Sequence, residues 1–174
     1  MKRKAVLSLS LFGSCLFLAG CGDLLSLYAL YTPSTAVFDA AYEGKWENKD
    51  DTVVVERSEN RYEVTLTAKY QGAEPGKFEM HLVDLHGVRF ADLLPEDHIG
   101  HMLLKVKVEG QRLHLAFLDS DWLRGHVPHE QSDIDHDRKQ AVLVQPTPQL
   151  QKLVAKYALD ERAYDKEVVF ERGK

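Results

Sequence analysis

Alternation of apolar and polar residues runs through the middle of the chain. Every second residue from Tyr62 to Tyr70 is apolar, and charged or hydroxyl residues stand between them. The same period of two returns over 102–108 and 113–117, on either side of the turn sequence at Gly110. A period of two puts all apolar side chains of a strand on one face. These segments are therefore predicted to be strands, the last two joined as a hairpin.

Shorter apolar segments extend this pattern towards both ends of the chain. Further strands are predicted over 52–56, 78–85, 88–93, 141–144 and 167–172. The short connections between successive strands favour an antiparallel meander. One apolar and one polar face per strand suits a barrel or a strongly curved sheet. The alternative is an α+β two-layer sheet with helices on one face.

One segment near the C-terminus has helical spacing instead. Apolar residues recur at Leu150, Leu153, Val154 and Tyr157. Thr147 followed by proline predicts a helix start, with the threonine as N-cap and proline in the first turn. We therefore expect one amphipathic helix over 148–158.

The N-terminus has a different pattern, a mainly apolar stretch over 5–19, interrupted by serines and one glycine, behind a basic segment, 2–4. The stretch is too short for a spanning helix, which needs roughly 20 residues, and suits a signal peptide. It ends in Leu18-Ala19-Gly20-Cys21, which resembles the lipobox of bacterial lipoproteins. The resemblance implies recognition of Leu18, Ala19 and Gly20 by the signal peptidase, cleavage after residue 20, and acylation of Cys21, for example with palmitate.

The predicted domain organisation follows from that cleavage. Residues 1–20 are a leader, 21–36 a lipidated N-terminus and tether, and 37–174 one β-rich domain. Pro33 breaks any helix in the tether, although its apolar residues leave open that part of it packs on the domain or lies at the membrane surface. Gly22, rather than aspartate, follows the lipidated residue. We therefore expect an outer-membrane location facing the periplasm.

Charge and cysteine content narrow the classes of function. The chain has 22 basic and 27 acidic residues, and removal of the leader would make it more acidic. An acidic domain without a basic cluster argues against a nucleic-acid partner. The leader would take Cys15 with it, and lipid would occupy the thiol of Cys21. Disulfides and thiolate metal sites are therefore not expected in the mature chain.

Two family resemblances concern the domain itself. Gly44-Lys45-Trp46 ahead of antiparallel strands and a late helix resembles the Gly-x-Trp start of lipocalin-type (calycin) barrels, which implies a barrel closed at one end by the tryptophan. A longer series of motifs is similar to an uncharacterised group of bacterial lipoproteins, and implies no activity. That series is Gly44-x-Trp46, Tyr62-Glu63-Val64, His81-Leu82, Asp92-Leu93-Leu94-Pro95, His101, Leu113-x-Leu115, Leu118-Asp119-Ser120-Asp121-Trp122-Leu123 and Thr147-x-x-Leu150-Gln151.

Histidines are the main chemical candidates. Two H-x-x-H pairs occur, at His98 and His101 and at His126 and His129, and His136 follows the second pair. His126, His129 and His136 are candidate zinc or copper ligands. However, Gly100 and Pro128 disfavour the helix on which such a spacing converges, so solvated surface histidines are the default interpretation.

The remaining candidates for catalysis have simpler explanations. Asp119 and Asp121 beside Trp122 superficially suggest a carboxylate pair next to a sugar platform, but helix capping beside a core tryptophan explains them equally. No nucleophile elbow, phosphate loop or dinucleotide fingerprint occurs in the sequence. We therefore expect no catalytic residues, no enzyme activity and no cofactor.

Three functional hypotheses remain from the sequence. The first is a lipid-anchored binding or interaction module that takes an unknown protein or small-molecule ligand. The second is a structural or assembly accessory of an envelope complex, with a histidine-based metal-binding protein as a lesser alternative. The third, ranked last because no convergent acid, base or nucleophile can be named, is an enzyme. A deep apolar pocket in the barrel favours small-molecule binding, whereas a filled interior with an exposed patch favours a protein partner.

Overall fold

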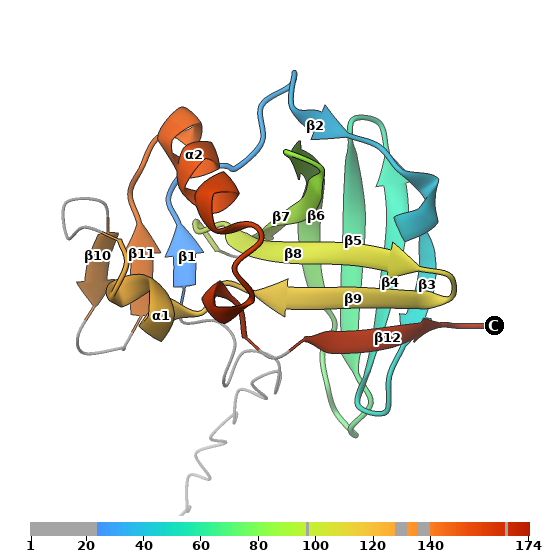
Figure 1. Ribbon diagram of the computed structural model, residues 1–174. Coiled ribbons are helices and arrows are strands. Elements are labelled where there is room, and N and C mark those ends of the chain that lie inside the picture. Colours follow the sequence, from blue (N-terminus) through green and yellow to red (C-terminus); the bar gives the residue numbers. More distant parts are fainter. Residues whose placement is uncertain (1–23, 97, 128–131, 136–139, 166) are drawn as a thin grey trace, which may run out of the picture.

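Eight antiparallel strands close into a barrel in the computed structural model, which describes residues 24–96, 98–127, 132–135, 140–165 and 167–174 (Figure 1). The ring order is β3-β4-β5-β6-β7-β8-β9-β12. The pairing of β12 with β3 closes the ring. This confirms the predicted mainly β fold and its calycin-like barrel, rather than the two-layer alternative. The barrel strands are β3 (Gly44–Glu47), β4 (Asp51–Ser58), β5 (Arg61–Ala68), β6 (Gly76–Leu85), β7 (Val88–Pro95), β8 (Met102–Glu109), β9 (Arg112–Phe117) and β12 (Val168–Arg172).

The alternating pattern determines which face of each strand points inward. In β5, Tyr62 and Val64 are buried in the interior cluster, while Glu63 between them is exposed. Closure depends on β12, which pairs with β9 on one side and β3 on the other. Phe170 lies opposite Leu113, and Arg172 lies opposite Trp46. The C-terminal strand therefore completes the barrel next to the Gly-x-Trp segment.

A second apolar cluster covers the outer face of β6, β7 and β8. These strands bury residues such as Val83, Phe90 and Leu103 on that face, so they are apolar on both sides. Strands with two buried faces read as nearly continuous apolar runs. The covering elements are α1 (Ser120–Arg124), α2 (Thr147–Tyr157), β1 (Leu24–Ser26) and β11 (Gln140–Leu143). β1 and β11 form a small sheet with β10 (Ser132–Asp135), and the short β2 (Ala36–Val37) pairs with β6.

The N-terminal segment from Leu24 belongs to this covering layer. Leu30 is fully buried, and its N–H donates to Asp92 Oδ2 at 2.6 Å. Thr147 Oγ1 and Gln151 Nε2 from α2 donate to the carbonyls of Ala29 and Leu30. The folded domain therefore begins before Val37, where the sequence placed its start. Of the apolar residues of the expected tether, Leu24, Leu25, Leu30 and Tyr31 pack on the domain, which is one of the alternatives that the sequence left open. Leu27 and Tyr28 are exposed.

The local helix predictions are confirmed, with one difference. α2 covers Thr147–Tyr157, and Thr147 is its first residue rather than its cap. The Thr147 hydroxyl donates to the Ala29 carbonyl instead of capping the helix. Asp119 caps α1 by accepting from Trp122 N–H at 2.8 Å, and Asp121 pairs with Arg124. Among the residues that the structure describes, no helix is long and apolar enough to span a membrane.

Candidate functional site

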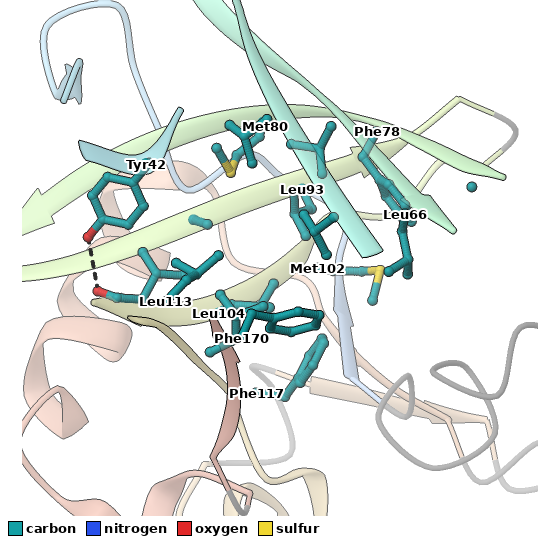
Figure 2. Close-up of a pocket in the computed structure, with 17 residues that line it drawn as sticks. Tyr42, Leu66, Phe78, Met80, Leu93, Met102, Leu104, Leu113, Phe117 and Phe170 are labelled. Carbon is teal, nitrogen blue, oxygen red and sulfur yellow. Dashed lines mark hydrogen bonds between the residues drawn. The ribbon is translucent and has the colours of Figure 1, made fainter. Parts of the chain in front are cut away.

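The barrel interior contains a cavity of about 110 Å³, and Figure 2 shows the side chains that line it. Seventeen residues from all of the long strands line it, and the Tyr42 hydroxyl is the only side-chain oxygen or nitrogen among them. The lining residues are Tyr42, Val53, Val55, Val64, Leu66, Gly76, Phe78, Met80, Ala91, Leu93, Met102, Leu104, Val106, Leu113, Leu115, Phe117 and Phe170. The cavity therefore offers its contents almost nothing but hydrocarbon and thioether contacts.

One end of the cavity is sealed, and we call it the closed end, defined by Tyr42, Trp46 and Arg172. Trp46 is fully buried and donates its Nε1–H to the Tyr42 carbonyl at 2.8 Å. The guanidinium of Arg172 lies 4.0 Å from the Trp46 ring centroid and donates to the carbonyls of Glu43 and Ala41. A cation over an indole face and two charge-assisted hydrogen bonds hold this end together.

The glycine of Gly44-x-Trp46 has a specific role in that seal. Its φ is +115°, a conformation that residues with a side chain rarely adopt. A Cβ at this position would also lie 3.1 Å from Arg172 Nη1. The chain thus needs glycine here, both for the backbone conformation and for the approach of the arginine.

The tyrosine at the closed end stays neutral and donates inward. Burial raises the pKa of Tyr42 to about 12. Its hydroxyl donates to the Val106 carbonyl at 3.3 Å, as the dashed line in Figure 2 shows. The only polar side-chain group in the lining is therefore already engaged, and the interior has no charge with which to bind a carboxylate or phosphate.

The other end of the cavity is exposed in part, and we call it the open end, defined by Leu66, Gly76, Phe78 and Leu93. These residues line the cavity but are only partly buried, unlike Tyr42 and Trp46. Figure 2 places Leu66 and Phe78 at the end opposite Tyr42. The Phe78 ring lies against Gly76, where an added Cβ would be 3.2 Å from Phe78 Cε2. The cavity is therefore partly exposed at this end, where the Phe78 ring packs on Gly76.

The cavity is large enough to matter energetically. At about 24 cal/mol per Å³, leaving 110 Å³ unfilled costs roughly 2–3 kcal/mol. That is a sizeable part of the 5–15 kcal/mol by which a typical domain is stable. An engineered apolar cavity of about 150 Å³ stays dry and accepts benzene. A ligand segment of similar size would thus fit here, and movement of the flexible Met80 and Met102 would make room for a longer one.

The histidines that the sequence singled out do not form one site. His126 is exposed and stacks on Trp122 with ring centroids 3.8 Å apart. Its Nδ1 donates a hydrogen bond to the Trp122 carbonyl at 2.7 Å. His129 and His136 lie outside the described residues, as do Leu18, Ala19, Gly20 and Cys21. Within the described ranges, no three His, Cys, Asp or Glu side chains are grouped to hold a metal ion.

His101, from the first H-x-x-H pair, and His81 have structural partners in the outer layer. His101 Nδ1 lies 2.6 Å from Asp92 Oδ1, and that carboxylate is only 1% exposed. His81 stacks on Tyr31 at 3.6 Å and contacts Glu79 at 3.0 Å. Both pairs fix the N-terminal segment against β6 and β7. The sequence contained no local signal for the attachment of the N-terminal segment, because Tyr31 meets His81 and Leu30 meets Asp92 across 50 and 62 positions of the chain.

A groove of about 480 Å³ on the outside of β8 and β9 is the other notable hollow. It is lined by three basic side chains and three carboxylates, those of Arg89, Lys105, Lys107, Glu161, Asp165 and Glu167. Lys105 pairs with Glu161 at 2.9 Å, and Glu167 Oε2 lies 2.9 Å from His114 Nδ1. Opposite charges that neutralise each other leave no net attraction for an ion. The interior cavity is therefore the stronger candidate site.

Comparison with protein-family models, with curated proteins and with solved structures gives no match. The calycin-like character of the chain therefore rests on its own geometry. That geometry includes the eight-stranded closed barrel, the glycine at positive φ, and the Trp46 seal with Arg172 stacked on it. Sequence analysis identified Gly44 and Trp46 but missed Arg172, whose role becomes visible only when β12 is paired with β3.

Proposed function

We propose that this protein is a lipid-anchored envelope lipoprotein that binds the hydrocarbon part of a small ligand inside its barrel. The observation that carries the proposal is the apolar cavity, sealed at one end and partly exposed at the other. A deep apolar pocket was the feature expected to favour small-molecule binding over a protein partner. The lipid on Cys21 and the outer-membrane location facing the periplasm are part of the proposal, and the lipobox resemblance supports them.

The chemistry of the lining specifies the class of ligand. Because the cavity contains no charged group and its one hydroxyl is engaged, the enclosed part of the ligand is uncharged and apolar. Any polar group of the ligand stays at the open end, in water. Alkyl chains with a terminal polar group satisfy both conditions. Ligands that bury a carboxylate are disfavoured, because an uncompensated charge in an apolar site is very costly.

Native mass spectrometry of the protein purified from cell envelopes tests this function. We expect the protein to carry acyl groups on Cys21 and, in addition, a non-covalent apolar molecule. The molecule should be lost from an Ala91→Leu variant, because Ala91 lines the cavity and leucine fills it. Thr65→Leu, which adds a leucine on the outer face of the barrel wall, should retain the molecule. Equal ligand content in both variants would place the molecule outside the cavity and contradict the proposal.

A further inference from the structure

An exposed apolar side chain projects from the open end of the barrel. Ile99 is 91% exposed, and it lies in the β7–β8 connection that follows Leu93 and precedes Met102. Both of those residues line the cavity. An isoleucine exposed to this degree buries almost none of its apolar surface in the folded domain. It therefore adds nothing to the core and is available for a contact outside the molecule.

The same connection is fixed to the N-terminal segment. Ser26 and His101 exchange two backbone hydrogen bonds, each 2.8 Å long. Leu25 lies directly against Gly100, where an added Cβ would be 2.8 Å from Leu25 Cδ1. Leu25 also packs against the interior cluster. The start of the described chain and the loop that carries Ile99 thus form one unit at the open end.

The predicted lipid attachment lies close to this unit in the chain. Cys21 precedes Leu24 by three residues. Since an extended chain spans at most about 3.6 Å per residue, the Cα of Cys21 is within about 11 Å of that of Leu24. The anchor therefore cannot hold the domain far from the membrane. The closed end, with the C-terminus and the β8–β9 hairpin, lies on the opposite side of the barrel (Figure 1).

We propose that the open end of the barrel faces the lipid bilayer, with Ile99 inserted into the bilayer interface, so that the cavity takes the hydrocarbon chain of a membrane lipid. This inference rests on the proposed function, because it needs both the lipid on Cys21 and the apolar cavity. The acyl chains supply the affinity for the membrane, since several signals together give stable anchoring. Insertion of Ile99 sets the orientation of the barrel relative to the membrane. A lipid chain then passes from the bilayer into the barrel without crossing water.

A fluorescence experiment on the full chain tests the orientation. The protein is produced in cells that acylate it, carrying either Ile99→Cys or Gln111→Cys, and is labelled with a maleimide fluorophore. Gln111 is an exposed residue of the β8–β9 turn at the closed end and serves as the matched control. After leader removal and acylation no other thiol is free to react. Both proteins are reconstituted into phosphatidylethanolamine–phosphatidylglycerol vesicles that contain nitroxide-labelled lipid.

We expect the label at position 99 to be quenched at least threefold more strongly than the label at position 111. Equal quenching, or stronger quenching at position 111, would overturn the orientation. The mass of the purified protein separates this failure from failure of the proposed function. A protein without acyl groups contradicts both proposals. An acylated protein that retains an apolar molecule but shows no selective quenching contradicts the orientation alone.

Discussion

The two ends of the barrel are built from similar apolar residues but differ in how they are held. At the closed end, Trp46 is fully buried, donates a hydrogen bond, and carries the Arg172 guanidinium on its face. At the open end, Phe78 is only partly buried and rests against a glycine. One aromatic ring is fixed by polar contacts, and the other is retained by packing alone. The comparison teaches that the fold is stabilised at one end and left adaptable at the other.

The largest effect is expected from removing the fixed ring. Trp46→Ala should lower the free energy of unfolding by about 3–5 kcal/mol, as for other buried aromatic residues. The change also removes the partner of the Arg172 guanidinium and the hydrogen bond to Tyr42. Urea denaturation measures the loss, and Trp46→Phe should recover most of it. A loss below about 1 kcal/mol would show that the closed end is not the stabilising one.

A smaller effect, an increase in the free energy of unfolding, is expected from filling the cavity between the two ends. Ala91→Leu fills the cavity, so it should raise the free energy of unfolding by about 1–2 kcal/mol and weaken binding of an alkyl ligand at least tenfold. Denaturation and calorimetric titration measure the two quantities, with Thr65→Leu as control. A destabilised variant that binds as tightly as the wild type would show that the cavity is neither a packing defect nor the ligand site.

At the open end, removing the Phe78 ring should change the rate of ligand dissociation more than the free energy of unfolding. Phe78→Ala is expected to lower the free energy of unfolding by about 1 kcal/mol, because the side chain is only partly buried. Ligand should dissociate several-fold faster, since the ring no longer covers the cavity. Stopped-flow displacement measures the rate. Phe38→Ala, which removes an exposed ring outside the cavity, should leave it unchanged. Equal rates in both variants would exclude Phe78 as a barrier.

The smallest effect concerns the carboxyl group of Asp51, the first residue of β4. Burial, and then the neighbouring Asp50, raise the pKa of Asp51 above its ordinary value of 3.8. The folded state therefore binds this proton more tightly than the unfolded state, and the contribution to stability falls as pH rises from 3.8 through the raised value. Asp51→Asn should be slightly more stable than the wild type at pH 7, and the difference should shrink below pH 3.8. A pH-independent difference would contradict this account.

The sequence predicted the barrel wall well because strand alternation is local. The pattern from Tyr62 to Tyr70 and the turn at Gly110 each identify strands without knowledge of the rest of the chain. The short strands β1, β2 and β10 escaped prediction, since two to four residues contain no measurable period. Their positions depend on pairing with distant segments.

The candidate site was less predictable than the fold. The Gly-x-Trp motif indicated a sealed end, but the arginine that completes the seal stands 126 positions after Trp46 in the chain. The cavity itself depends on the small side chain of Ala91 among larger neighbours, and on closure by β12. The buried Asp92, which holds both Leu30 and His101, likewise joins separate segments. Sequence patterns report which face a residue occupies, not what lies across from it.

The most direct test of the central claim uses the two methionines of the domain. Met80 and Met102 are the only methionines in residues 21–174, and both line the cavity. A protein of residues 21–174 with Cys21→Ser and an initiator methionine removed, labelled with ¹³C at the methionine methyl groups, should give two NMR signals. Addition of 1-octanol should shift both signals saturably at one equivalent, and Ala91→Leu should abolish the shifts. Two signals that do not move at saturating octanol would contradict a ligand site inside the barrel.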